Sequence, residues 1–392
     1  MADKNKIFVI SAADRYNFGD LIFNYIIQDS LSSEIKSKYQ IIYTSLLGND
    51  LSKYQGHKTT GIRKVLKTLV DGDILLFAGG GLLGHKWEPM FAQTRRNVFF
   101  KYFKKLFSRE FNEFFLRSVV FRTRNRYPYT ISAKHLKKNI AIIYNSVGGG
   151  ALDVMKDELN EIRNILLTSS YISVRDRNVQ EILSLNNIVL SPDSAILLSK
   201  IYSKSELFNK ASREIQNILL DDYVILHFNK AIASSYKNEI NDFINWLKEK
   251  IRKKIILLPV NYINNNDIKG QRLFRENMNC YVINRKLRLF EICAIIAHAQ
   301  FVIGTSLHVN IIACSYEIPH LGMTNKIDKL NSFYQTWYND SQVFGCYEFN
   351  DLKKNVLLAF SNRNEVVKVS NTLKEKTEKN FDRINSIISQ YK

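Results

Sequence analysis

The chain has 392 residues, which is enough for two domains of ordinary size, each with its own hydrophobic core. Its hydrophobic content of 45% is that of a globular protein, and no stretch reaches the roughly 18 apolar residues that a membrane-spanning helix needs. The four cysteines form no CxxC pair, which favours reduced thiols over zinc ligands or disulfides. Charges precede the first apolar run and no signal peptide is recognisable, so we expect a cytoplasmic protein.

The formal net charge of +19 predicts an acidic partner, such as nucleic acid, an anionic membrane or a phosphorylated substrate. Residues 85–135 hold twelve Lys or Arg and three Glu, so this short span carries nearly half of the excess, together with thirteen aromatic residues. No zinc-finger, basic-zipper or RNA-binding signature accompanies this charge. We therefore expect no nucleic-acid partner.

Short apolar runs alternate with helical stretches along almost the whole chain. They predict one series of strands at 7–11, 41–44, 74–77, 140–147, 171–174 and 187–190, and a second series at 223–228, 255–260, 281–284 and 301–304. Continuously apolar strands that alternate with helices are typical of parallel sheets covered on both faces. The predicted fold class is therefore α/β, with two doubly wound parallel-sheet domains that face a cleft and bind ligands beyond the carboxyl ends of their strands.

The predicted N-terminal α/β domain covers residues 1–200 and includes the basic aromatic insert at 85–135. A polar stretch at 199–217 suggests the boundary, and the second α/β domain covers residues 201–345. Residues 346–392 are helical in pattern and heavily charged, so we expect them to pack back across a domain surface.

Two loops in the N-terminal half carry residues suited to ligand contact. After the first predicted strand, a loop is closed by Asn17, Gly19 and Asp20, and Asp20 can cap the following helix. After the strand at 74–77, backbone N–H groups can approach a ligand closely at Gly79, Gly80 and Gly81. Neither loop matches a P-loop or a dinucleotide fingerprint. An ordinary helix cap and a tight turn are the alternatives.

The segment 304–323, GTSLHVNIIACSYEIPHLGM, places His308 near the start of a helix that directly follows a buried strand. Ser306 is the predicted N-cap, and residues 307–316 have helical spacing. The free N–H groups and the partial positive charge of a helix start favour phosphate or carboxylate. The alternative is a histidine that fills space between two helices.

In this order, the segments resemble the polysaccharide pyruvyl transferase family. The residues that carry the resemblance are NFGD at 17–20, AGGGLL at 78–83, SVRD at 173–176, SPD at 191–193, GTSLH at 304–308 and EIP at 317–319. The resemblance implies transfer of pyruvate from phosphoenolpyruvate to two hydroxyls of a sugar as a cyclic ketal, during synthesis of a bacterial capsule or exopolysaccharide. It also implies a glycosyltransferase B-like arrangement of two domains, with phosphoenolpyruvate as donor substrate and no separate cofactor.

Catalytic roles are expected for three residues, two of which follow from the resemblance. The resemblance places a phosphoenolpyruvate-contacting arginine at Arg175, where a guanidinium can grip an anion at two points; a surface pair with Asp176 is the alternative. His308 matches the family's motif histidine and can protonate either the enol carbon or the leaving phosphate. Asp20 is our choice as base or hydrogen-bond acceptor for a sugar hydroxyl, oriented by Asn17, with a helix cap as the alternative.

Many family members have Arg where this chain has Ser306, so an anion contact is lost here. It could be replaced by the backbone at the helix start, at Ser306 and Leu307, or by the side chains of Lys230, Lys326 or Lys329.

Three further residues near predicted strand ends are candidate substrate contacts: Asp193, His227 and Asn229. A helix cap is the competing role for Asp193, and filling the core is the competing role for His227. The seven histidines are scattered, so the sequence predicts no metal site.

A glycosyltransferase B-type enzyme that uses a nucleotide sugar is the second candidate function, with Glu317 offered as the ribose-binding carboxylate.

The basic insert has the pattern of an amphipathic helix. Its apolar face contains Phe99, Phe103, Leu106 and Phe107, and is continued by Phe111, Phe114 and Phe115. Its cationic face contains Lys101, Lys104, Lys105 and Arg109. This pattern predicts peripheral attachment to an anionic membrane, where a lipid-diphosphate-linked sugar acceptor would lie. An ordinary amphipathic helix packed on the core is the alternative.

Overall fold

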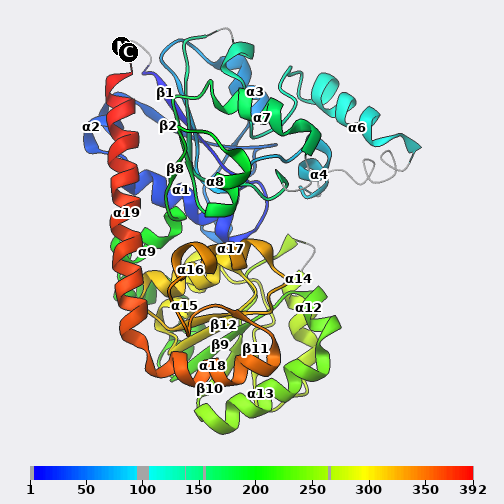
Figure 1. Cartoon of the computed structure of the whole chain (residues 1–392), viewed down its shortest axis with the longest axis vertical. Helices are drawn as coiled ribbons and strands as arrows, with labels where there is room; N and C mark the ends of the chain where they lie inside the picture. Colours follow the sequence, from blue (N-terminus) through cyan, green and yellow to red (C-terminus); the bar gives the residue numbers. More distant parts are fainter. Residues whose placement is uncertain (1–3, 95–105, 137, 153–155, 264–265, 392) are drawn as a thin grey trace. The chain divides into compact units, whose positions relative to one another are not determined.

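The computed structural model describes residues 4–94, 106–136, 138–152, 156–263 and 266–391. They fold into two compact units, each built on its own parallel sheet (Figure 1). The N-terminal unit contains the residues up to Tyr16, Asp20–Ser194 and the residues from Thr377 onward. The C-terminal unit contains Asn17–Gly19 and Ala195–Lys376. The predicted α/β class with two parallel sheets is confirmed.

The sheet of the N-terminal unit has the strand order β3-β2-β1-β4-β6-β7-β8, with β5 paired to β6. The pattern of apolar runs predicted six of these strands: β1 (Lys6–Ile10), β2 (Gln40–Ser45), β4 (Ile74–Phe77), β6 (Ala141–Gly148), β7 (Tyr171–Val174) and β8 (Val189–Leu190). The other two, β3 (Thr60–Gly61) and β5 (Gly80–Gly81), span two residues each, which is too short for a periodic pattern. All pairings are parallel, so the carboxyl ends of the strands lie along one edge.

Helices connect these strands, as the alternation predicts: α1 (Phe18–Ser30), α2 (Ser33–Lys38), α3 (Ile62–Thr68), α4 (Trp87–Ala92), α6 (Arg109–Phe115), α7 (Leu159–Leu166) and α8 (Arg177–Leu183). Because α1 begins at Phe18, Asp20 lies in its first turn and is not the N-cap that the sequence suggested. The carboxylate still benefits there from the partial positive charge of the helix start.

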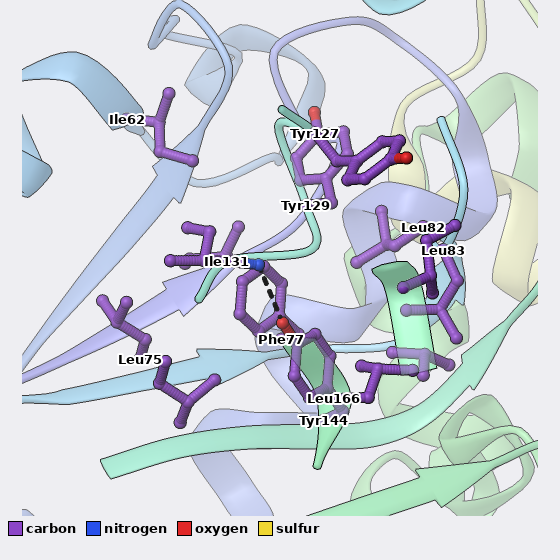
Figure 2. Packing of buried hydrophobic residues seen from close by; sticks show 14 of the residues in the cluster. Ile62, Leu75, Phe77, Leu82, Leu83, Tyr127, Tyr129, Ile131, Tyr144 and Leu166 are labelled. Carbon is purple, nitrogen blue, oxygen red and sulfur yellow. Dashed lines mark hydrogen bonds between the residues drawn. The ribbon is translucent and has the colours of Figure 1, made fainter. Parts of the chain in front are cut away.

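Part of the basic aromatic insert belongs to the core of the N-terminal unit (Figure 2). Tyr127 and Tyr129 are fully buried, and the hydroxyl of Tyr144 in β6 accepts a hydrogen bond of 3.0 Å from the backbone N–H of Ile131. The Tyr144 ring also stacks on Phe77 of β4, with 4.5 Å between centroids. These contacts hold the end of the insert against the sheet.

The sheet of the C-terminal unit has the order β11-β10-β9-β12-β13-β14, again entirely parallel. Its strands are β9 (Tyr223–His227), β10 (Lys254–Leu257), β11 (Tyr281–Val282), β12 (Phe301–Gly304), β13 (His320–Met323) and β14 (Cys346–Tyr347). The sequence pattern missed β13, whose four residues begin with a histidine and include a glycine, and β14, which spans only two residues. His320 of β13 is buried, with Nδ1 2.8 Å from the carbonyl oxygen of Ile318 and Nε2 3.2 Å from the hydroxyl of Tyr338.

The predicted boundary region at 199–217 is mostly helical, and the two units divide just before it, between Ser194 and Ala195. It contributes to the first three helices of the C-terminal unit, α9 (Leu198–Ile201), α10 (Lys204–Lys210) and α11 (Arg213–Leu219). The other helices of this unit are α12 (Lys230–Ser235), α13 (Lys237–Ile251), α14 (Asn266–Gln271), α15 (Leu289–His298), α16 (Leu307–Ser315), α17 (Asp328–Trp337) and α18 (Phe349–Ser361). The last helix, α19 (Arg363–Gln390), begins in this unit, and its residues from Thr377 onward belong to the N-terminal unit. None of the helices among the described residues combines the length and the apolar character needed to cross a membrane.

Candidate functional site

Arg175 is the centre of a buried polar cluster in the N-terminal unit. It directly follows the last residue of β7, and only 6% of its surface is exposed. Its Nη1 lies 3.1 Å from Oδ2 of Asp193, and its Nε lies 3.8 Å from Oδ2 of Asp176. Asp176 also caps α8 by accepting a hydrogen bond of 3.0 Å from the N–H of Val179. The pair predicted as a surface alternative is therefore buried, and Asp193 joins it.

Glycines give the Arg175 guanidinium its space. A Cβ on Gly148, the last residue of β6, would lie 2.6 Å from Nε of Arg175, and a Cβ on Gly81 would lie 3.9 Å from Nη2. A Cβ on Gly80 would lie 3.4 Å from Oδ1 of Asp20. Gly79 has a φ of 125°, which favours glycine, and packs against the ring of Phe23. The glycine loop thus lies between the predicted residues Asp20 and Arg175.

Two residues that the sequence analysis missed belong to the same region, Arg15 and His85. Arg15 is only 8% exposed; its Nη1 lies 3.3 Å from Oδ1 of Asp14, and its Nε has no hydrogen-bond partner among the described residues. Burial and the nearby charge of Arg15 lower the pKa of His85. A hydrogen bond with the backbone of Gly81 and the charge of Asp20 raise it, but by less. Only their positions in the sequence could have predicted this, because each lies in a loop beside a motif: Arg15 before NFGD and His85 after AGGGLL.

His308 lies in the C-terminal unit as the second residue of α16. Ser306 occupies the N-cap position but makes no side-chain cap hydrogen bond, and Leu307 is buried. The loop residues Asn17–Gly19 belong to this unit, and a Cβ on Gly19 would lie 2.0 Å from Nδ1 of His308. Only glycine allows this approach while His308 keeps its position. Asn17 forms an isolated bridge with Asn261 in the same unit.

His227 and Asn229 are held by contacts within the protein. His227 is buried at the end of β9, with Nε2 3.1 Å from Oδ2 of Asp267 and Nδ1 3.4 Å from Oγ1 of Thr305. The side chain of Asn229 caps α12 by accepting a hydrogen bond of 3.0 Å from the N–H of Ile232. These contacts give a structural role to His227 at the end of β9 and to Asn229 in the loop that follows.

The three lysines that could replace the missing family arginine are exposed. Lys230 begins α12, and Lys329 is the second residue of α17. The ammonium of Lys326 lies over the ring of Tyr236, 4.8 Å from its centroid, and contacts the Tyr236 hydroxyl. The structure thus places Lys326 on an aromatic neighbour.

Residues 6–327 match the model of the family described as polysaccharide pyruvyl transferase. The chain belongs to this family. The match ends before α17, so it includes every predicted site residue except Lys329. Among curated protein sequences, none matches the chain.

Solved structures similar to this pyruvyl transferase family member show its fold. A UDP-GlcNAc 2-epimerase from Neisseria meningitidis aligns with a TM-score of 0.56 at 10% identity, covering 99% of this chain and 100% of the other. The corresponding enzyme from Methanocaldococcus jannaschii gives a TM-score of 0.55 at 14% identity, covering 99% of both chains. At such identities the similarity concerns the fold alone, which is the glycosyltransferase B type that the sequence predicted.

Within the family framework, the motifs fall into two groups. AGGGLL, SVRD and SPD lie in the N-terminal unit, and GTSLH lies in the C-terminal unit. NFGD is divided, because Asn17–Gly19 belong to the C-terminal unit while Asp20 belongs to the N-terminal unit. Arg175, Asp20 and the glycine loop are therefore brought together in one unit, and His308 and Gly19 in the other.

Proposed function

We propose that this protein transfers pyruvate from phosphoenolpyruvate to a sugar and closes a cyclic ketal on two of its hydroxyls. The observation that carries the proposal is a pair of buried guanidiniums at the carboxyl edge of the N-terminal sheet: Arg175, which lies beside Gly81, and Arg15, whose charge acts on His85 next to the same loop. Arginine forks and backbone N–H groups are suited to the carboxylate and phosphate of this donor. Family membership supplies the reaction class.

Asp193 contacts Nη1 of Arg175. Nη2 faces Gly81, whose missing Cβ would lie 3.9 Å away, so no side chain from that position fills the space beside it. Arg15 brings a buried Nε that has no hydrogen-bond partner among the described residues, and an anion would satisfy it. We therefore assign the donor's anionic groups to Arg15, Arg175 and the backbone of Gly79–Gly81.

The reaction requires a proton on the methylene carbon of the enol. Protonation there makes the adjacent carbon electrophilic, one sugar hydroxyl attacks it, and the second hydroxyl replaces the departing phosphate. We assign this proton, or the proton on the leaving phosphate, to His308, which α16 holds beside Gly19. Asp20 would accept a proton from an attacking hydroxyl. The products are the ketal and inorganic phosphate, and no step needs a metal.

The first test combines purified protein, phosphoenolpyruvate and candidate sugar acceptors, including lipid-diphosphate-linked sugars. We expect phosphate release that depends on the acceptor, a product with the mass of a pyruvyl ketal, and activity that persists in EDTA. Loss of activity in EDTA that a divalent cation restores would contradict the metal-free assignment.

A His308→Gln variant tests the proton donor. Positioned acid–base groups contribute about a hundredfold to ten-thousandfold, so we expect turnover to fall by that range while the melting temperature stays close to that of the wild type. A folded variant with a normal rate would remove His308 from the mechanism.

The nucleotide-sugar alternative can be separated by ligand stabilisation. The similar epimerase from Neisseria meningitidis binds UDP-GlcNAc, and the fold is shared. A ligand at a hundred times its Kd adds about 2.7 kcal/mol of stability. We expect a thermal shift with phosphoenolpyruvate and none with UDP- or GDP-sugars; the reverse result would favour a glycosyltransferase.

A further inference from the structure

The described part of the basic insert exposes a row of large apolar side chains, which we call the aromatic ridge: Leu106, Phe107, Phe111, Phe114 and Val119. Leu106 is 77% exposed and Phe114 is 55% exposed. Phe111 and Phe114 lie in α6, and the ring of Phe107, which precedes the helix, stacks on Phe111 with 4.8 Å between centroids. In Figure 1, α6 projects from the N-terminal unit. The opposite side of this helix is anchored by Leu116 and Asn112, which are buried.

A cavity of about 330 Å³ adjoins the ridge and shares Phe114 with it. Four cationic side chains line this cavity: Lys86, Arg109, Arg117 and Arg126. Two of them are neutralised, because Lys86 lies 2.8 Å from Glu158, and Arg126 lies 2.5 Å from Glu158 and 2.6 Å from Glu161.

Arg109 and Arg117 carry the remaining positive charge. Among the residues that the structure describes, neither forms an ion pair or a side-chain hydrogen bond. Glu113 does not compensate them, because both of its oxygens accept backbone N–H groups at the start of α4, from Trp87 and Glu88, each at 2.9 Å. Glu110 is the only other carboxylate that lines the cavity.

We propose that the aromatic ridge and the adjoining cavity form a binding site for the surface of an anionic lipid bilayer. The ridge would enter the interface, and Arg109 and Arg117 would contact lipid phosphates. A protein partner could cover an apolar face, but Arg109 and Arg117 beside it, which form no ion pair among the described residues, match a surface that is both apolar and negatively charged. The predicted cationic residues Lys101, Lys104 and Lys105, with Phe99 and Phe103, lie outside the described residues, so the site rests on residues 86–94 and 106–126 alone.

Vesicle flotation tests this site, with phosphatidylcholine vesicles and with vesicles that also contain phosphatidylglycerol. We expect the wild type to float only with the anionic vesicles and less so as salt rises. Arg109→Glu with Arg117→Glu, and separately Phe111→Ser with Phe114→Ser, should each lower the bound fraction about tenfold. The matched control, Arg213→Glu with Arg275→Glu, makes the same change in net charge at exposed positions of the C-terminal unit and should bind normally.

Failure of the wild type to float with either vesicle would overturn the proposal, as would equal loss in the control. A lipid-independent dimer that Phe111→Ser with Phe114→Ser disrupts would also overturn it, because the ridge would then be an interface between copies of the chain. The outcome is separate from that of the proposed reaction, since phosphate release with a water-soluble acceptor does not require vesicles. The Arg109/Arg117 and Phe111/Phe114 double variants should both retain that activity.

Discussion

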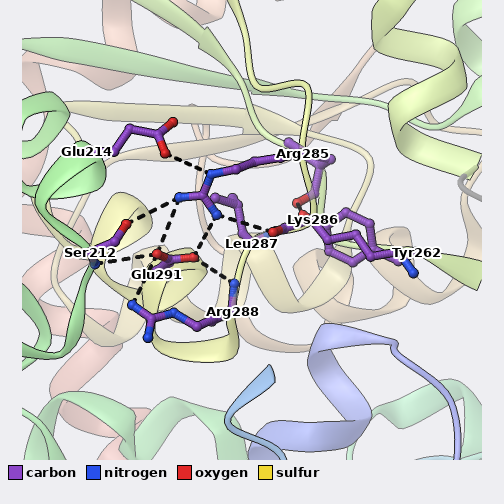
Figure 3. A network of polar contacts seen from close by, with 9 residues as sticks. Ser212, Glu214, Tyr262, Arg285, Lys286, Leu287, Arg288 and Glu291 are labelled. Atoms are coloured by element: carbon purple, nitrogen blue, oxygen red, sulfur yellow. Dashed lines mark hydrogen bonds and ion pairs between the residues drawn. The ribbon is translucent and has the colours of Figure 1, made fainter. Parts of the chain in front are cut away.

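Two arginine–carboxylate clusters, one in each unit, have nearly the same ion-pair distance and different surroundings: Arg175 is buried, whereas Arg285 is 36% exposed and only its carboxylate partner Glu291 is buried. In the N-terminal unit, Nη1 of Arg175 lies 3.1 Å from Asp193. In the C-terminal unit, Nη1 of Arg285 also lies 3.1 Å from its carboxylate, Glu291 (Figure 3). The distance alone therefore cannot tell a ligand site from a structural contact.

The surroundings of the two clusters make the distinction. Glu291 accepts hydrogen bonds from the backbone of Ser212 and Arg288 and from the side chains of Arg285 and Arg288, so its oxygens are saturated by the protein. Arg285 also contacts Glu214 at 3.0 Å, which closes the network. Arg175 instead has glycines at positions 81 and 148 against its guanidinium. Saturated partners indicate a structural network. Gly148 instead makes room for the Arg175 guanidinium itself, and Gly81 leaves space beside its Nη2 atom.

Breaking the saturated network should produce the largest effect, on stability. Glu291→Gln removes the buried carboxylate shared by Arg285 and Arg288, whose side chains are more than a third exposed, so we expect a loss of about 2 kcal/mol at neutral pH. Urea unfolding followed by fluorescence measures it, and the transferase rate of the folded variant should be unchanged. A loss below about 1 kcal/mol would show that the network is dispensable.

The same variant has a pH signature. Burial opposes ionisation of Glu291, but hydrogen bonds from Arg285, Arg288 and Ser212 outweigh it and lower its pKa to about 2. A carboxyl with a lowered folded-state pKa stabilises the fold above its unfolded value of 4.5 and loses that contribution as the pH falls toward 2. The stability difference between wild type and Glu291→Gln should therefore shrink across this window.

Replacing the arginine of each cluster by lysine sharpens the comparison. Lysine keeps the charge but loses the planar fork, so Arg175→Lys should lower kcat/KM for phosphoenolpyruvate about a hundredfold with little change in melting temperature. The matched control, Arg285→Lys, should lower the melting temperature and leave kcat/KM unchanged. The reverse pattern would mean that Arg175 is structural and that the donor binds elsewhere.

The sequence was sufficient for the fold and for the motifs, because apolar runs such as Ile74–Phe77 and Phe301–Gly304 become strands with the predicted bounds. It was insufficient where tertiary contacts decide. Arg15 and His85 belong to no periodic pattern and acquire their surroundings only when the strand ends come together. The role of Glu291 was equally hidden, since its donors come from residues up to 79 positions away.

The smallest expected effect concerns the glycine that makes room for Arg175. A Cβ on Gly148 would lie 2.6 Å from Nε and 2.8 Å from Cζ of that guanidinium, so Gly148→Ala must displace it. Because Gly148 has no positive φ, the backbone itself tolerates alanine, and the effect should appear as a loss of about tenfold in kcat/KM with a nearly normal melting temperature. Gly345→Ala is the control, since its nearest atom, the Tyr347 hydroxyl, would lie 3.3 Å from the new methyl group in the C-terminal unit. If both variants keep the wild-type rate, the Arg175 guanidinium can shift without loss of activity. The reaction then does not require its position beside Gly148.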